Sequence, residues 1–346
     1  MIAFCIELKR YMKVEFKVLS YHQCCHQIWV IIGFYIMIKL PTLTSVPKGL
    51  IHCPVTPFKK NNKIDLDKFA QVIEFLLSHN AAALCVNLHL AESLNLSLKE
   101  RKLLAKTSVE VSANRVPVII NVSTPGTDHA IELTQHAEKV GADSIMSIAP
   151  YYWKPPEESL YEHFSEIMSA TSLPFIGYNS PLIMDGVGIS PDLLIRLINQ
   201  FPHFIGIKDA SHNWEVFLEL GRAARTLKPD FGLFVGTEWM IPSLTLGGNT
   251  CMSVFGGIAP NFVNLLYKET TDGNLKLALE LQYKYSELYQ ITKVEYPAPT
   301  KAMWEIMGRP VGIPRRPQRP VPKEGIKIME QTLARLGLLD TEPYGW

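Results

Sequence analysis

The sequence predicts an α/β fold, a (β/α)8 TIM barrel with a C-terminal helical extension. From Gly49 onward, short apolar runs alternate with amphipathic helical patterns. The alternation repeats about every 30 residues, which is the length of one βα unit. Eight such units close into a barrel of about 250 residues. That number fits the stretch from Lys48 to about Thr270.

Eight apolar runs are the candidate strands: Leu50–Val55, Ala82–Val86, Val116–Asn121, Ser144–Ile148, Leu173–Tyr178, Phe204–Lys208, Phe231–Gly236 and Thr250–Val254. Between them lie helical patterns: Asp65–His79, Leu98–Val111, Thr127–Val140, Glu157–Ala170, Pro191–Asn199 and Asn213–Leu227. Asp65 and Ser190 stand where helix N-caps belong, and Pro191 follows at the first helical position.

The chain divides into three predicted regions. Residues 1–47 form an N-terminal extension outside the fold, 48–271 form the barrel, and 272–346 form helices packed on it. The last region holds the helical patterns Leu275–Val294, Ala298–Met307 and Lys323–Leu336, with the Pro- and Arg-rich connector Arg309–Pro317 between the second and third. No linker long enough for an independent second domain separates these helices from the barrel, so their apolar faces are expected to bury against it or against a neighbouring subunit.

The N-terminal extension differs in character from the rest. Its apolar run Ile28–Ile38 is shorter than the roughly 20 residues that cross a bilayer, and no convincing signal-peptide cleavage site follows it. The cluster His22, Cys24, Cys25 and His26 suggests metal, but adjacent cysteines rarely both reach one ion and no second ligand pair follows. We expect an appended or wrongly started leader unrelated to the fold.

Composition limits the class of partner. A formal net charge of +1, with Lys and Arg scattered, gives no electrostatic reason to expect nucleic acid or an acidic membrane. A small-molecule substrate is the expected partner. The six cysteines lack framework spacing, and Cys53, Cys85 and Cys251 lie in apolar runs where reduced thiols are common. A reducing, cytoplasmic location fits best.

The candidate strand Phe204–Lys208 ends in an amine. Burial of that end would strip water from the ammonium and favour its neutral form. A neutral amine attacks a ketone and forms a Schiff base, which is how lysine becomes a covalent catalyst. Lys208 is therefore the first candidate for catalysis.

Catalytic groups of such barrels come from the C-terminal ends of strands and the loops after them. That rule selects His89 and Glu92 after strand two, Tyr151 and Tyr152 after strand four, Tyr178 ending strand five, Lys208, Glu238 after strand seven and Ser253 at strand eight. A lysine with a tyrosine at hydrogen-bond distance can form an imine and move protons around it.

Several segments resemble one family in order and barrel position. They are Thr56-Pro57-Phe58, Ala149-Pro150-Tyr151-Tyr152, Leu173–Pro181, Ile205-Gly206-Ile207-Lys208-Asp209, Gly236-Thr237-Glu238 and Pro297-Ala298-Pro299-Thr300-Lys301. Through them the chain, from Gly49 to about Leu338, resembles the dihydrodipicolinate synthase / N-acetylneuraminate lyase family of class I, Schiff-base pyruvate aldolases.

The resemblance implies a role for each matching position. Lys208 would form the imine with pyruvate, and Tyr178 would handle protons at the imine and hydroxyl. Tyr152 would complete a proton relay across a tight dimer interface, and Tyr151 would pack there. Glu238 and Ser253 would contact the distal part of the substrate. The resemblance also implies a homotetramer, a dimer of dimers.

The loop after strand two departs from the family. The family typically has Gly-Thr-Thr-Gly-Glu or Gly-Ser-Thr-Gly-Glu, whose N–H groups and hydroxyls hold the pyruvate carboxylate; here the segment is Leu88–Ser93, and only the acid, Glu92, remains. We expect His89, Leu90 and Glu92 to line this part of the substrate site. An imidazole passes protons near neutral pH, so His89 is a candidate replacement for the lost hydroxyls.

The loop after strand five departs as well. Synthases of the family place an arginine there to bind the carboxylate of aspartate semialdehyde, but Leu182-Ile183-Met184-Asp185 contains none. An apolar loop lacks the bidentate grip that a carboxylate favours. Ile183 is therefore predicted to contact an apolar or neutral aldehyde, and lysine biosynthesis is a weaker interpretation than the resemblance alone suggests.

Structural interpretations stand beside these functional ones. Lys208 could simply pair with Asp209, the tyrosines could be packing aromatics, and Glu92 could only hold its loop. Glu238 and Ser253 could be ordinary loop residues, and His89 a satisfied loop or core histidine.

Three functions follow from these interpretations. The first is a lyase or synthase that makes or breaks a bond of pyruvate or a 2-keto acid, with an aldehyde as the second substrate. It needs neither metal nor cofactor, because the imine accepts the electrons. A true 4-hydroxy-tetrahydrodipicolinate synthase is an alternative within the family. The second is a catalytically impaired, ligand-binding or regulatory barrel. The third, a metal-dependent aldolase using His52, His89 and Glu92, is disfavoured because His52 lies within strand one.

Overall fold

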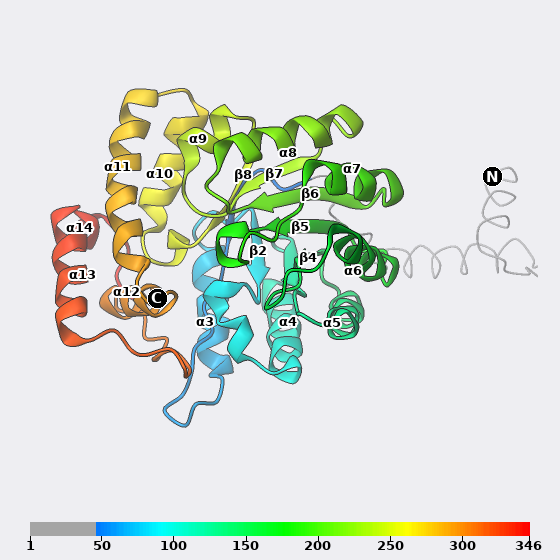
Figure 1. The fold of residues 1–346 in the computed structure, drawn as a ribbon. Coiled ribbons are helices and arrows are strands. Elements are labelled where there is room, and N and C mark those ends of the chain that lie inside the picture. The colour runs from blue at the N-terminus through cyan, green and yellow to red at the C-terminus, as the bar shows by residue number, and fades with distance from the viewer. Residues whose placement is uncertain (1–45) are drawn as a thin grey trace, which may run out of the picture. The chain divides into compact units, whose positions relative to one another are not determined.

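The computed structural model describes residues 46–346, which form a closed barrel of eight parallel strands in sequence order, surrounded by helices (Figure 1). The strands are β1 (Gly49–His52), β2 (Ala83–Val86), β3 (Val118–Asn121), β4 (Ser144–Ile148), β5 (Phe175–Asn179), β6 (Phe204–Asp209), β7 (Gly232–Val235) and β8 (Thr250–Ser253). Pairing of β8 with β1 closes the barrel, and the predicted fold class is confirmed. The expectations for the N-terminal leader and for the cluster His22, Cys24, Cys25 and His26 fall outside the described residues.

Each strand of the barrel is followed in the chain by a helix. They are α3 (Leu66–Leu77), α4 (Leu98–Ser112), α5 (Thr127–Lys139), α6 (Glu157–Ser169), α7 (Pro191–Gln200), α8 (Trp214–Leu227), α9 (Met240–Thr245) and α10 (Pro260–Thr271). Both predicted caps are confirmed: the Asp65 side chain accepts from the N–H of Lys68, and Ser190 accepts from that of Leu193. The predicted boundaries of strands and helices differ from these by at most three residues, because the apolar runs extend past the last ladder hydrogen bond.

Four short 3-10 helices lie in the loops that leave the barrel strands. They are η1 (His89–Ala91), η2 (Ser93–Asn95), η3 (Pro181–Ile183) and η4 (Phe255–Gly257). Three of them carry or adjoin predicted site residues, since η1 and η2 follow β2 and η3 follows β5. The loops at the carboxyl ends of these strands therefore contain short 3-10 turns.

The C-terminal helices pack together beside α3 and α10 (Figure 1, yellow to red). They are α11 (Leu275–Thr292), α12 (Ala298–Ile306), α13 (Lys323–Arg335) and α14 (Leu338–Thr341). Their apolar faces join the same core as the barrel, through residues such as Tyr285, Trp304 and Leu333. The division at residues 47 and 271 stays a prediction. None of the helices between residues 46 and 346 is long and apolar enough to cross a membrane.

The indole of Trp304 on α12 fills the space beside Gly257 of η4. A Cβ added to Gly257 would lie 1.7 Å from Cζ2 of that ring. The indole is 1% exposed and packs against Phe75 at 5.8 Å between ring centroids. A glycine at position 257 is therefore what allows α12 to approach the end of β8.

We predict that Gly257→Ala lowers the free energy of unfolding by about 2 kcal/mol, because overpacking a rigid core typically costs that much. Urea unfolding measures the loss. In a Trp304→Leu background the same change should cost much less, since the clashing ring is gone. Equal losses in the two backgrounds would contradict the proposed packing constraint.

Candidate active site

Lys208 lies at the carboxyl end of β6, inside the barrel mouth. Its side chain is only 4% exposed, and in the sheet register it is flanked by Tyr178 on β5 and Phe234 on β7. The Nζ atom lies 3.4 Å from the centroid of the Tyr178 ring, a distance typical of a cation held on an aromatic face. The structure thus brings together the predicted nucleophile and the predicted strand-five phenol.

Asp209 follows Lys208 but points to the other face of the strand, because successive side chains alternate. Its carboxylate accepts hydrogen bonds from Nδ2 of Asn179 at 2.6 Å and Oγ of Ser211 at 2.7 Å. Burial raises the pKa of Asp209, and these hydrogen bonds oppose the rise. The interpretation in which Asp209 simply pairs with Lys208 is wrong, so the amine has no carboxylate directly bound to it among the described residues.

His89 begins η1 and faces the same mouth. Its ring packs edge-on against Tyr296 at 5.1 Å between centroids. Burial lowers the pKa of His89, and the nearby charge of Lys208 lowers it further. His89 is therefore neutral at pH 7, and its imidazole lies close enough to Lys208 to feel the charge of the amine.

Glu238 and Ser253 form one buried pair. Oγ of Ser253 donates to Oε1 of Glu238 at 2.8 Å, and the backbone N–H of Phe255 donates to the same oxygen at 2.7 Å. Oε2 has no hydrogen-bond partner among the described residues. Burial raises the pKa of Glu238 to about 7, against the effect of these hydrogen bonds. The carboxyl group therefore changes charge near neutral pH, and one of its oxygens is buried without a hydrogen-bond partner among the described residues.

Tyr152 and Ile183 lie on the rim and are exposed, by 95% and 53%. Tyr152 has a positive φ of 93° and packs on Trp153. An ion pair of 2.8 Å between Lys154 and Asp185 joins the loop of Tyr152 to that of Ile183. No contact of Tyr152 with Lys208 or Tyr178 is found in the part of the chain that the structure describes.

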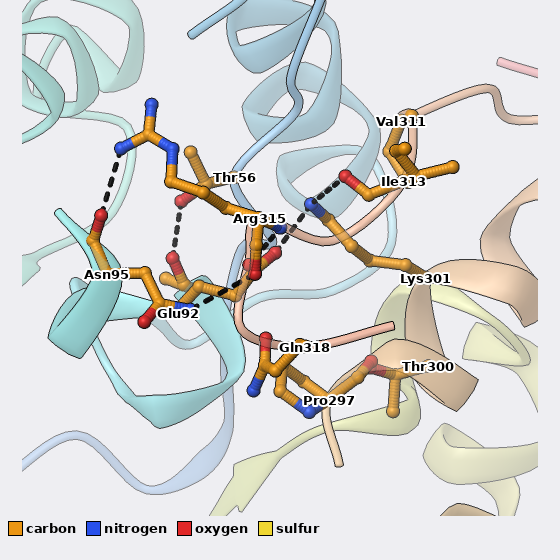
Figure 2. A network of polar contacts seen from close by, with 12 residues as sticks. Thr56, Glu92, Asn95, Pro297, Thr300, Lys301, Val311, Ile313, Arg315 and Gln318 are labelled. Atoms are coloured by element: carbon orange, nitrogen blue, oxygen red, sulfur yellow. Dashed lines mark hydrogen bonds and ion pairs between the residues drawn. The ribbon is translucent and has the colours of Figure 1, made fainter. Parts of the chain in front are cut away.

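Glu92 and Leu90 are buried in the loop after β2. The carboxylate of Glu92 does not line an open space; it binds Nζ of Lys301 at 2.6 Å and the backbone N–H of Arg315 at 2.7 Å (Figure 2). Glu92 thus has a structural partner set within the single chain. The substrate role predicted for it stays untested.

Sequence reasoning assigned no role to Lys301, Arg315 or Tyr296. Lys301 was visible as part of the segment Pro297–Lys301, but its partner Glu92 lies 209 residues away and no local pattern joins them. Tyr296 follows α11 and contacts His89, and burial raises the pKa of its phenol. Residues of the C-terminal region therefore reach the barrel mouth.

Among residues 46–346 no group of three or more His, Cys, Asp or Glu side chains is arranged to hold a metal ion. His52, one member of the weighed metal set, is buried and bonds through Nε2 to the backbone oxygen of His79 at 3.0 Å. Burial lowers the pKa of His52 to about 4. His52 therefore packs against α3 rather than facing His89 and Glu92.

Comparison with known proteins now assigns the family. The profile of the dihydrodipicolinate synthetase family matches residues 46–336. The chain belongs to this family. The resemblance inferred from the sequence is confirmed, as is the expectation of a class I aldolase type of enzyme.

Relatives and solved structures span nearly the same region. The 4-hydroxy-tetrahydrodipicolinate synthase of Acetivibrio thermocellus is 32% identical over 287 residues, which is 82% of this chain and 96% of the relative. That of Archaeoglobus fulgidus is 31% identical over 294 residues, 84% of this chain and 99% of the relative. YagE, a prophage protein of the dihydrodipicolinic acid synthase family from E. coli K12, in complex with pyruvate, superposes with a TM-score of 0.80 at 27% identity, covering 84% of this chain and 99% of that one.

We predict that Glu238 makes stability depend on pH. The pKa of Glu238 is near 7 in the folded protein and ordinarily 4.5. Between these two pH values the folded protein therefore keeps a proton that the unfolded chain loses. Stability should therefore fall as pH rises from about 4.5 to 7, by roughly 3 kcal/mol, and then level off.

Urea unfolding at pH 5 and pH 8 tests this dependence. Glu238→Gln should remove that part of the dependence, because the amide does not titrate. The matched control is Glu280→Gln on the exposed face of α11, which should leave the pH dependence of the wild type. An unchanged dependence in Glu238→Gln would contradict the shifted pKa.

Proposed function

We propose that this protein forms a Schiff base between Lys208 and the ketone of pyruvate or a related 2-keto acid. It then makes or breaks the carbon–carbon bond at the adjacent carbon, with an aldehyde as second substrate or product. The observation that carries the proposal is the buried amine at the end of β6, held 3.4 Å from the Tyr178 ring and without a bound carboxylate among the described residues. The pyruvate complex of YagE supports the substrate class.

The steps follow from the chemistry of an amine and a ketone. The amine attacks the carbonyl carbon, a C–N bond forms, and the carbonyl oxygen leaves as water, which gives an iminium ion. Loss of a proton from the neighbouring carbon, or cleavage of its bond to the former aldehyde carbon, releases an electron pair that the iminium accepts as an enamine. Protonation of the enamine, or its attack on an aldehyde, and hydrolysis of the imine complete the cycle.

Protons must move at two places in this sequence. We assign Tyr178 to the imine and hydroxyl, as the family resemblance implies; its phenol ring lies against the Lys208 amine. We assign His89 to the pyruvate methyl, because burial keeps its imidazole neutral and Lys208 is in electrostatic range. The N–H groups in the first turn of a helix lack acceptors within it, so those at the start of η1, at His89 and Leu90, suit the substrate carboxylate.

The second substrate is proposed to be a neutral or apolar aldehyde. Leu182 and Ile183 are exposed on η3, and the next charged group, Asp185, is negative and paired with Lys154. Such a loop gives no favourable contact to a second carboxylate. The names of the curated relatives favour a second candidate, a 4-hydroxy-tetrahydrodipicolinate synthase, whose aldehyde carries a carboxylate.

An assembly of identical chains is proposed as well. Tyr152 and Trp153 expose aromatic area on the rim, and such patches are common in interfaces between subunits. One solved relative, superposing with a TM-score of 0.79 at 29% identity over 84% of this chain and 97% of that one, is described as a monomeric dihydrodipicolinate synthase variant. Family membership alone therefore does not fix the subunit number, and the dimer of dimers and the cytoplasmic location stay proposals.

We predict that borohydride in the presence of pyruvate attaches a reduced pyruvyl group to Lys208, because reduction makes the imine permanent. Mass spectrometry of the intact protein and of its peptides measures the adduct. Lys208→Arg should lose it, and Lys154→Arg, on an exposed lysine, should keep it. No adduct on the wild type at high pyruvate would exclude the proposed chemistry and favour a binding or regulatory barrel.

A second prediction concerns the aldehyde. The wild type should have a higher kcat/KM for neutral aldehydes than for aspartate semialdehyde, measured with pyruvate as the common substrate. Ile183→Arg should raise kcat/KM for the semialdehyde roughly tenfold, as a charged hydrogen bond to its carboxylate would. Ile183→Gln, the neutral control, should not. A wild type that prefers aspartate semialdehyde would support the synthase candidate instead.

A further inference from the structure

The loop between β2 and α4, residues 87–97, contains no glycine but turns sharply. Two of its residues have the positive φ angles that glycine adopts without strain: Asn87 at 63° and Glu92 at 56°. Asn tolerates such an angle, but for Glu92 it costs about 1 kcal/mol or more and persists only where the surroundings enforce it. The shape of this loop therefore depends on contacts from elsewhere in the fold.

The strongest of these contacts is made by the Glu92 carboxylate. Oε1 lies 2.6 Å from Nζ of Lys301, and Oε2 accepts the N–H of Arg315 at 2.7 Å (Figure 2). The two side chains of the ion pair are 0% and 1% exposed. Next to Glu92, the backbone oxygen of Ala91 accepts from Oγ1 of Thr56 at 2.7 Å. The end of η1 is thus held by hydrogen bonds to the backbone of Ala91 and to the side chain of Glu92.

Lys301 is itself held from several sides. Its Nζ lies 3.4 Å from the backbone oxygen of Ile313 and 4.2 Å from the centroid of the Phe58 ring. Burial lowers the pKa of Lys301 to about 8, and the charge of Glu92 opposes this. The ammonium is therefore protonated at neutral pH and the pair is ionic there.

Arg315 extends the same attachment to the far end of the loop. Its guanidinium binds the carboxylate of Glu100 on α4 at 2.8 and 3.0 Å, and Nη1 donates to the backbone oxygen of Asn95 at 2.9 Å. Lys301 and Arg315 both belong to the C-terminal region. The loop that bears His89 and Leu90 is consequently fixed by residues more than 200 positions away.

We propose that Lys301 is a positioning residue for the carboxylate of the 2-keto acid: through Glu92 it holds the turn His89–Ala91 in the geometry that binds this group. The proposal rests on the proposed function, because the carboxylate is that of the Schiff-base substrate. Lys301 does not touch the reacting atoms. Removal of its charge leaves Glu92 buried without a partner, which favours a rearranged loop.

The test measures borohydride trapping on Lys208 as a function of pyruvate concentration. Lys301→Met keeps the length of the side chain but removes the charge. It should raise the half-saturating pyruvate concentration roughly ten- to a hundredfold, the loss expected when a binding group moves by about 1 Å. Trapping at saturating pyruvate should be retained. Lys301→Arg, which restores the charge, should recover much of the lost affinity.

Arg309→Lys is the matched control for general damage to the C-terminal region. Arg309 is 0% exposed and donates to the backbone oxygens of Pro343, Gly345 and Ile258, none of them in the β2–α4 loop. This variant should lower the midpoint of thermal unfolding and leave the half-saturating concentration unchanged. A purely structural role for Lys301 would make the two variants behave alike.

If Lys301→Met does not fold, the double variant Glu92→Gln/Lys301→Met replaces it, because no buried charge is then left alone. It should still raise the half-saturating concentration severalfold, though less than Lys301→Met, because the attachment to Lys301 is lost but no uncompensated charge displaces the loop. The proposal is overturned if the variant that folds has a half-saturating pyruvate concentration within twofold of the wild type. In that case trapping by the wild type still supports the Schiff base. Absence of trapping in the wild type itself overturns both.

Discussion

The site depends on one constraint: eight parallel strands in sequence order close into a barrel, so all their carboxyl ends meet at one mouth. Lys208 and Tyr178 are 30 residues apart in the chain but adjacent in the register of β5 and β6. His89, Glu238 and Ser253 reach the same mouth from β2, β7 and β8. A shift of one residue in any strand would exchange its inward and outward side chains, and for β6 it would replace the amine of Lys208 by the carboxylate of Asp209.

That alternation places the amine of Lys208 and the carboxylate of Asp209 on opposite faces of β6. Lys208 points inward without a bound carboxylate among the described residues, and Asp209 points outward into hydrogen bonds with Asn179 and Ser211. An amine paired tightly with a carboxylate would be held as the cation, which does not attack a ketone. The neighbouring thiols of Cys53, Cys85 and Cys251 have pKa values raised by burial, so they are uncharged and add no anion beside the amine. The sequence Lys-Asp thus serves two separate purposes on the two faces of one strand.

The parts of this arrangement that follow local rules could be predicted from the sequence. The period of about 30 residues predicted the barrel, and the rule that catalytic groups follow strand ends selected Lys208 and Tyr178, which the fold brings together. The pair of Lys301 and Glu92 could not be predicted this way, because it joins residues 209 positions apart and no local pattern connects them. Tyr152 stands between these cases. Its place after β4 was predictable, but its side chain is exposed and packs only on Trp153 among the described residues, so the predicted relay role has no support within the single chain.

The loop after β2 shows how contacts from distant parts of a chain can hold a turn that the local sequence does not favour. Glycine reaches left-handed backbone angles without strain, but residues 87–97 contain none. Glu92 takes such an angle nevertheless, and the cost of about 1 kcal/mol is offset by the contacts of its carboxylate with Lys301 and Arg315. A buried ion pair with an additional backbone hydrogen bond is directional and resists displacement, since separating its partners leaves an uncompensated charge. The contacts that hold this turn come from α12 and from the connector after it. If the proposed role of Lys301 holds, a change in the C-terminal region alters substrate binding at the barrel mouth through this loop.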